Sequence, residues 1–129
     1  MKKFLAVAFS FFLLGGCFGS DNIVDSEYEL KQDNELFRIV IGFNNDGRFY
    51  SNAINGVTGV YQLNNDSITL SINSKTNVVP HQDYVAIENT YFSDLRKVNK
   101  FRTTPSSLSL YTYDGKTLQF DRVGKAQVQ

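Results

Sequence analysis

The stretch FRIVIGFNNDGRFY, residues 37–50, decides the fold. In its first half apolar side chains recur at every second position and so share one face of a β-strand: Phe37, Ile39, Ile41 and Phe43. Residues 44–47, Asn-Asn-Asp-Gly, then separate this strand from another that begins at Arg48, because Asn and Gly tolerate the positive φ of tight turns. The stretch therefore predicts an antiparallel hairpin with one buried face.

The same alternation recurs further along the chain, at residues 68–72, 107–110 and 118–121. Turn residues at 64–66 and 114–115 indicate two more hairpins. Residues 83–97 differ, because apolar side chains there recur at spacings of three and four and predict one amphipathic helix. That stripe consists of Tyr84, Ile87, Tyr91, Leu95 and Val98.

These elements predict a mainly β fold of the β-rich α+β class. We expect a curled antiparallel sheet or partial barrel of about six to eight short strands, with the amphipathic helix packed on it. A length of 129 residues suits one domain. The expected core consists mainly of aromatic side chains, namely Phe37, Phe43, Phe49, Phe92, Leu95, Phe101 and Phe120.

The N-terminus is typical of a bacterial lipoprotein. Lys2 and Lys3 precede an apolar run at residues 4–14, which is too short to span a bilayer and resembles a secretory leader. The run ends in Leu-Gly-Gly-Cys, residues 14–17, which resembles a lipobox, so Cys17 is the expected site of acylation. We expect a signal peptide at 1–16, a lipidated tether at 17–26, a domain at 27–123 and a loose tail at 124–129. In enterobacterial lipoproteins, which this segment resembles, an Asp after the Cys favours retention in the inner membrane. Phe18 stands there in this chain, so the resemblance implies an outer-membrane lipoprotein facing the periplasm, held to the membrane by its acyl anchor.

Composition and motifs argue against several other classes. Thirteen basic and 13 acidic side chains give no basic excess for nucleic acid, and one Cys with one His cannot build a closed zinc site. His81 has only Asp83 as a nearby carboxylate and no Gly-x-Ser-x-Gly motif beside it, which indicates a solvated loop or helix-start residue. We expect no catalytic residues, no metal and no cofactor, and hence no enzyme.

The densest basic segment, which we call the basic cluster, consists of Arg96, Lys97, Lys100 and Arg102. One interpretation is contact with the phosphate groups of anionic lipid near the anchor. The other is that the first two residues complement the helix dipole while the last two project from the wet face of a strand.

The order of these features resembles the META domain, the family that includes the HslJ type of heat-inducible envelope protein. The resemblance rests on residues 43–49, on Asn55, Gly59 and Tyr61, on Thr76 and Glu88, and on residues 108–120. Apart from the resemblance, Gly59 suits a bulge or tight bend, and the Asn55 side chain suits bonds to local backbone. Two cysteines common in the family are absent, because this chain has Ala53-Ile54-Asn55 and Val78-Val79-Pro80 there.

The resemblance implies a non-enzymatic envelope protein with a structural or binding role, linked to stress or antibiotic tolerance. The alternative is a carrier or inhibitor whose curled sheet holds a small apolar ligand or a segment of a partner protein.

Overall fold

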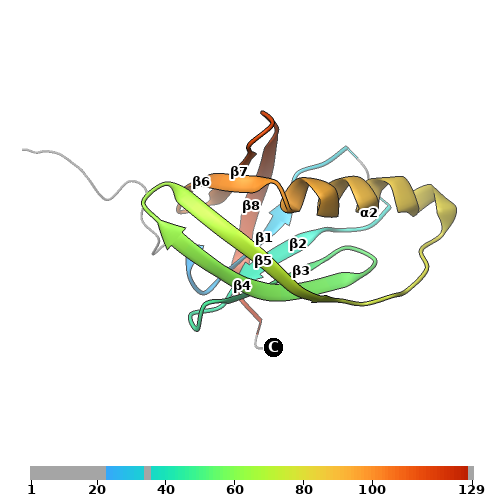
Figure 1. Ribbon diagram of the computed structural model, residues 1–129, viewed down its shortest axis with the longest axis horizontal. Helices are drawn as coiled ribbons and strands as arrows, with labels where there is room; N and C mark the ends of the chain where they lie inside the picture. Colours follow the sequence, from blue (N-terminus) through green and yellow to red (C-terminus); the bar gives the residue numbers. More distant parts are fainter. Residues whose placement is uncertain (1–22, 34–35, 128–129) are drawn as a thin grey trace, which may run out of the picture.

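The computed structural model describes residues 23–33 and 36–127, and these form a ring of antiparallel strands with a helix at one end (Figure 1). The elements in chain order are β1 (Ser26–Leu30), β2 (Val40–Phe43), β3 (Arg48–Asn52), β4 (Gly56–Asn64), β5 (Ser67–Lys75), α2 (Gln82–Leu95), β6 (Val98–Thr104), β7 (Ser107–Thr112) and β8 (Thr117–Lys125).

Each strand pairs with the next along the chain, and β8 pairs back with β1, so the sheet is a closed barrel. The closing pairs run from Ser26 opposite Lys125 to Leu30 opposite Phe120. The predicted fold class is confirmed. The sheet, which was expected to be curled or partly closed, forms a complete ring. Closure provides partners for the first and last strands, which an open sheet would leave as edges.

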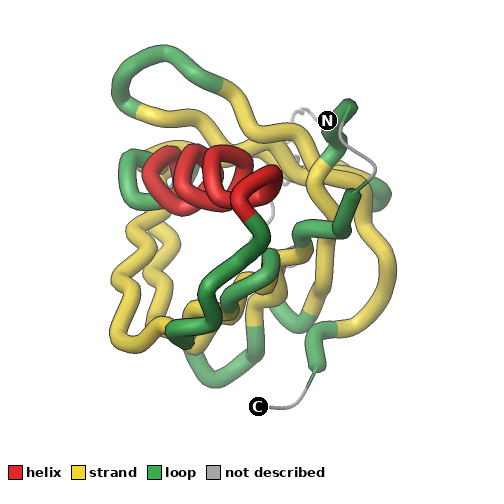
Figure 2. Tube along the Cα trace, turned by 90° about the vertical axis from the view of Figure 1, so that its right-hand side faces the viewer, coloured by secondary structure: helices red, strands yellow, loops and turns green. Residues whose placement is uncertain are grey.

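The up-and-down order gives the barrel two distinct ends. At one end, which we call the helix end, lie α2 and the connecting residues 31–33, 36–39, 53–55, 76–81 and 113–116. The other, which we call the termini end, has Ile23, residues 126–127 and the turns at 44–47, 65–66 and 105–106. Figure 2 views the helix end, and α2 lies in front of the ring of strands.

The barrel interior is filled with side chains. Phe43, Phe49, Phe92, Leu95, Phe101 and Phe120 are all at most 2% exposed, as expected for the core. Phe37 is the exception. Strand β2 begins only at Val40, so Phe37 lies in the preceding loop, half-buried, with its ring 5.4 Å from that of Tyr84 on α2.

The observed helix and hairpins agree closely with those predicted from the sequence. Helix α2 ends at Leu95, so Val98, which had been assigned to the helical stripe, instead begins β6. Gly47, Asn65 and Gly115 have positive φ angles of 88°, 58° and 96°, and each lies in one of the three expected hairpin turns.

Both predicted domain boundaries move outward. Ile23 is fully buried and Ser26 begins β1, although both had been assigned to the flexible tether. Gly124 and Lys125 had been assigned to the loose tail, yet they pair with β1 as the last residues of β8. Their polar, glycine-containing sequence gave no strand signal, because their extended conformation comes from pairing with a distant strand. Residues 1–22, with the predicted leader and Cys17, lie outside the described residues.

Candidate functional site

Asn55 is the hub of a buried polar network at the helix end. It lies in the β3–β4 loop and is 4% exposed. Its side-chain Nδ2 donates to the Val78 carbonyl (2.8 Å) and to Glu88 Oε2 (3.0 Å), while Oδ1 accepts from Thr76 Oγ1 (2.8 Å) and from the Val78 backbone N–H (2.7 Å). Every hydrogen-bonding position of this amide is therefore occupied.

Glu88 brings helix α2 into the same network. It is 2% exposed, and its Oε1 accepts the backbone N–H of Asn55 at 2.5 Å. Thr76 completes the arrangement, because its Oγ1 also accepts the Gly56 backbone N–H at 3.0 Å. The network joins α2, the β3–β4 loop and the segment after β5, which lie far apart in the sequence. Its buried groups are used in structural bonds among themselves, which is expected of a fixed junction.

A second buried contact links α2 to the barrel wall. The Tyr91 hydroxyl lies 2.6 Å from Ser51 Oγ, which in turn donates to the Val40 carbonyl at 2.8 Å. Burial raises the pKa of Tyr91 well above its ordinary value, so the phenol stays protonated. The sequence analysis placed Tyr91 on the apolar stripe but missed Ser51, because a Ser in a strand carries no signal of what lies across the barrel.

Gly59 permits a close approach of two strands. A Cβ at this position would lie 1.9 Å from the Ser71 carbonyl oxygen and 2.9 Å from the Phe49 ring. The pairing of β4 with β5 also shifts register between Thr58 and Gly59. The irregularity lies beside Gly59, with Asn73 of β5 as the residue without a partner, and backbone atoms occupy the space that a side chain at Gly59 would need.

Tyr61, two residues on, secures the β2–β3 turn. Its ring packs edge-on against Phe43, with centroids 5.1 Å apart, and its hydroxyl donates to the Asn44 carbonyl at 2.6 Å. Burial, and secondarily the carboxylates of Asp46 and Asp25, raise the pKa of Tyr61. The three motif residues, Asn55, Gly59 and Tyr61, therefore serve different parts of the barrel. The contacts of Asn55 lie at the helix end, and those of Tyr61 lie at the termini end.

A further tyrosine network, which the sequence did not indicate, lies on the outer face of the barrel. The Tyr50 ring fills the space over Gly42, where a Cβ would come within 2.2 Å of it. Its hydroxyl donates to Glu27 Oε1 and accepts the Gln127 backbone N–H at 2.8 Å. Burial is the main cause that raises the pKa of Tyr50 to about 12. The contact holds residues after β8 against the barrel.

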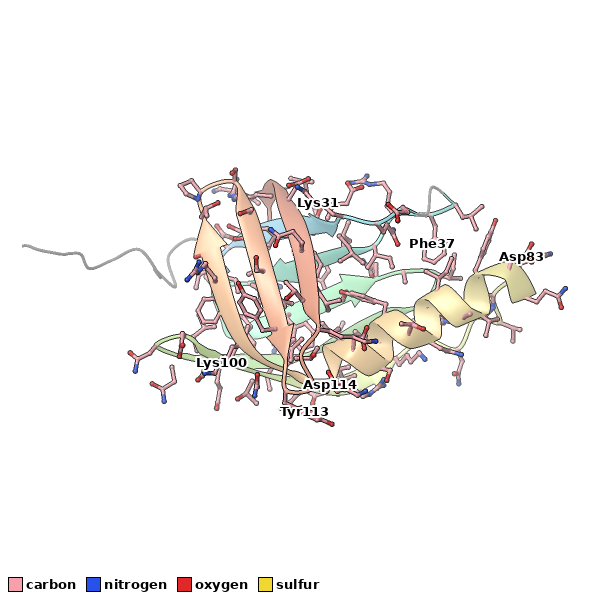
Figure 3. The ribbon with its side chains drawn as sticks, turned by 90° about the horizontal axis from the view of Figure 1, so that it is seen from above. Lys31, Phe37, Asp83, Lys100, Tyr113 and Asp114 are labelled. Carbon is pink, nitrogen blue, oxygen red and sulfur yellow. The ribbon has the colours of Figure 1, made fainter. Side chains whose placement is uncertain are left out.

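The basic cluster is divided between two places. Arg96 caps α2, with Nη1 donating to the Phe92 carbonyl at 3.3 Å, and Lys97 pairs with Asp114 at 3.1 Å. Lys100 and Arg102 are exposed on β6, and Lys100 pairs with Ser67 at the start of β5, toward the termini end. In Figure 3, Lys100 lies away from α2 whereas Asp114 lies beside it. The four cations therefore do not form one patch.

The Lys97–Asp114 pair is the clearest electrostatic feature of the surface. Hydrogen bonds from Thr112 and Lys97 lower the pKa of Asp114, and the Asp114 carboxylate raises the pKa of Lys97. Both groups are solvent-exposed at their charged ends, so the pair is a modest stabilising contact.

His81 lies where the sequence placed it, immediately before the helix. Its Nδ1 accepts the Asp83 backbone N–H at 3.2 Å, which makes it the N-cap of α2. The imidazole is 64% exposed and is flanked by the Asp83 carboxylate. Within residues 23–33 and 36–127 no group of three or more His, Cys, Asp or Glu side chains is placed to hold a metal ion.

The most apolar hollow of those described lies at the helix end, between α2 and the ends of β1 and β8. It has a volume of about 420 Å³, and its lining includes Leu30, Ile39, Ile87 and Leu118. A neighbouring hollow of about 650 Å³ shares Leu30 with it and is crossed by the ion pairs Lys31–Asp121 and Arg38–Glu29. Both are open depressions outside the filled barrel interior.

Comparison with known proteins assigns the domain. A model of the META domain matches residues 23–125, which include the hub residue Asn55 and every strand of the ring. The chain belongs to the META domain family. The resemblance inferred from the sequence is confirmed. No curated protein matches the chain.

Solved structures share the fold of this META domain at low sequence identity. A protein from Burkholderia xenovorans studied by NMR has a TM-score of 0.68 at 16% identity, with 88% of this chain and 94% of that one covered. A second NMR structure has a TM-score of 0.60 at 16% identity, covering 78% and 92%. A DUF4847 family protein from Bacteroides vulgatus has a TM-score of 0.50 at 19% identity, covering 70% and 61%. At such identities the likeness concerns the fold alone.

None of the helices in the described part of the META protein is long and apolar enough to cross a membrane.

Proposed function

We propose that this META protein is a lipid-anchored protein of the bacterial cell envelope with a non-enzymatic structural or binding role, in envelope stress or antibiotic tolerance. The acyl group on Cys17 holds it to the outer membrane, with the domain facing the periplasm. Family membership and the lipobox-like sequence at residues 14–17 support this proposal.

One observation supports the proposal that the role of the protein is not enzymatic. The polar side chains buried at the helix end are satisfied by one another, as the four bonds of the Asn55 amide illustrate. A catalytic centre instead usually has titratable groups that face a cleft with capacity left for a substrate. Asn55 and Glu88 are 4% and 2% exposed, and both serve to hold α2 on the barrel.

Metabolic labelling tests the anchor. Cells that make the full-length protein are grown with radioactive palmitate, and the wild type is compared with Cys17→Ala. The wild type should be labelled and fractionate with the outer membrane, whereas Cys17→Ala should lose the label and retain its leader. Equal labelling of the two proteins would overturn the anchored part of the proposal.

A second candidate is a carrier of a small apolar molecule. The apolar hollow of about 420 Å³ between α2, β1 and β8 favours it, because sites for small molecules are concave and mainly apolar. Such a ligand would lie under α2, since side chains fill the barrel interior. Native mass spectrometry of the full chain purified from cells tests this function. A bound mass that Leu118→Gln removes would support it, and an unloaded wild type would count against it.

A further inference from the structure

Asn55 and Gly56 form the only Asn-Gly dipeptide in the chain. An Asn side chain is most prone to spontaneous deamidation when Gly follows it, because Gly has no Cβ to hinder attack by its backbone nitrogen and leaves the backbone free to bend. The Asn55 amide is also the hub of the network that joins α2 to the barrel. The amide with the most labile sequence context therefore lies at a junction of the fold.

Deamidation at this dipeptide needs water as its only co-reactant. The backbone nitrogen of Gly56 loses its proton and attacks Cγ of Asn55, the bond between Cγ and Nδ2 breaks, and ammonia leaves. Water then opens the resulting cyclic succinimide at either of its carbonyl groups, which yields aspartate or isoaspartate at position 55. The reaction requires that the nitrogen be free to lose its proton and that Cγ turn toward it.

The folded chain holds both reacting groups in other contacts. The Gly56 N–H donates to Thr76 Oγ1 at 3.0 Å, and the same hydroxyl donates to Asn55 Oδ1 at 2.8 Å. The backbone of Asn55 is fixed as well, because its N–H donates to Glu88 Oε1 and its C=O accepts the Ala53 N–H at 2.8 Å. Asn55 is 4% exposed, which restricts the access of water. These contacts keep the nitrogen and the amide apart while α2 is docked.

The product of deamidation does not suit the same place. The Asn55 Nδ2 donates to the Val78 carbonyl and, at 3.0 Å, to Glu88 Oε2. A carboxylate in its place has no proton to donate, so it would leave the carbonyl unpaired and would repel the buried Glu88 carboxylate. Isoaspartate would also add a methylene group to the backbone directly before Gly56, where β4 begins opposite Asn52. Either product opposes the docking of α2.

We propose that Asn55-Gly56 is a latent modification site, which is protected only while α2 is docked on the barrel. When the helix end opens, the Gly56 nitrogen and the Asn55 amide lose their partners, and deamidation can proceed. Local opening of a native domain is reversible by itself. The carboxylate formed at position 55 makes the opening permanent, because it opposes Glu88. The proposal does not depend on whether Cys17 is acylated or on what the protein binds.

Peptide mass spectrometry of the purified full chain tests the protection. The chain is incubated at mildly alkaline pH, which favours loss of the amide proton, either in buffer or in guanidinium chloride. The peptide that contains residue 55 is then analysed for aspartate and isoaspartate. Modification should be at least about 100-fold slower in buffer, because native domains are unfolded for about 10⁻³ of the time or less. Equal rates in buffer and in denaturant would overturn the proposal.

A pair of threonine variants, each checked by circular dichroism for a native fold, tests the local contacts. Thr76→Val removes the hydroxyl that bonds both Gly56 and Asn55, and it should speed the modification in buffer by about tenfold or more. Thr58→Val is the matched control, because its hydroxyl bonds Ser74 in an exposed pair, and it should leave the rate unchanged. Equal rates for the two variants would count against the proposal.

Refolding tests whether the modification is irreversible for the fold. Gly56→Ala should slow the attack, and its Cβ would come closest to Asn52 Oδ1, at 2.6 Å, on an exposed side chain that can move. After incubation in guanidinium chloride and dilution, the folded fraction of the wild type should fall with incubation time, and molecules modified at residue 55 should be confined to the unfolded fraction. Gly56→Ala should recover fully after the same incubation.

Two results of the refolding experiment would overturn the proposal. Modified wild-type molecules that regain the stability of unmodified ones would show that a carboxylate at position 55 is tolerated beside Glu88. An equal loss of the folded fraction in Gly56→Ala would show that a different reaction prevents refolding.

Discussion

Replacing Asn55 by Ala should be among the most destabilising single substitutions outside the aromatic core. The change removes four side-chain hydrogen bonds of 2.7–3.0 Å, which join the β3–β4 loop to Thr76, Val78 and Glu88. At a net contribution of about 1 kcal/mol for each bond, the loss is about 4 kcal/mol. The stability of a domain is typically about 5–15 kcal/mol, so the variant should be close to unfolding at physiological temperature.

Urea unfolding followed by circular dichroism measures the effect. The matched control is Asn99→Ala, because Asn99 is an exposed asparagine on β6 and its truncation should change stability by less than about 0.5 kcal/mol. A loss of less than about 1.5 kcal/mol for Asn55→Ala would refute the view that this network holds α2 on the barrel.

A pair of further variants separates hydrogen bonding from packing. Asn55→Asp keeps the shape but turns a donor 3.0 Å from Glu88 Oε2 into a second carboxylate oxygen. Glu88→Gln restores a donor at that contact, so the double variant should be more stable than the sum of the single effects by about 0.5–3 kcal/mol. Strict additivity in urea unfolding would mean that the two side chains do not interact as described.

Three other predictions concern separate parts of the molecule. Gly59→Ala should cost about 3 kcal/mol or more in urea unfolding, because its Cβ would lie 1.9 Å from the Ser71 carbonyl oxygen; a cost equal to that of Val60→Ala at the exposed neighbouring position would contradict the close approach. Tyr61→Phe should lower the free energy of unfolding by about 1 kcal/mol through loss of its 2.6 Å bond to a turn carbonyl, and unchanged stability would count against that bond. Asp114→Asn should lower the melting temperature at neutral pH, and the difference from wild type should disappear as the pH falls below 3.8, because a carboxyl with a lowered pKa stabilises the fold only while it is ionised; a difference that persists in acid would exclude this cause.

Much of the fold could be predicted because it depends on local patterns. Alternating apolar residues gave the strand with Ile41 and Phe43, turn residues gave three hairpins, and the three-to-four spacing around Tyr91 gave the helix. In each case neighbouring residues determine the outcome, since a side chain faces the core according to its place in the local period.

Features that depend on distant partners were missed. Gly124 and Lys125 belong to a strand because they pair with β1. The sequence around them had predicted a loose tail. Phe37 was assigned to a strand from its alternation, but β2 begins only at Val40, and Phe37 lies in the loop before it with its ring against that of Tyr84. The basic cluster appeared continuous in the sequence, but Arg96 and Lys97 follow the end of α2, whereas Lys100 and Arg102 lie within β6.

The candidate site could be predicted only in outline. Asn55 was identified from the family resemblance, but the expectation that its side chain bonds local backbone was wrong, because its amide bonds the backbone of Val78, 23 residues away. Its contact with Glu88 bridges 33 residues, and nothing in the helical stripe distinguished that glutamate from a solvated one.

The pairing of β1 with β8 has a consequence for how the molecule assembles. The ring joins Ser26 to Lys125, so synthesis must be almost finished before its last seam can form. Contacts of such long sequence separation form slowly, and until then the nascent chain exposes two bare strand edges that invite aggregation. A chaperone that shields the emerging polypeptide would therefore matter most in the interval before the final strand arrives.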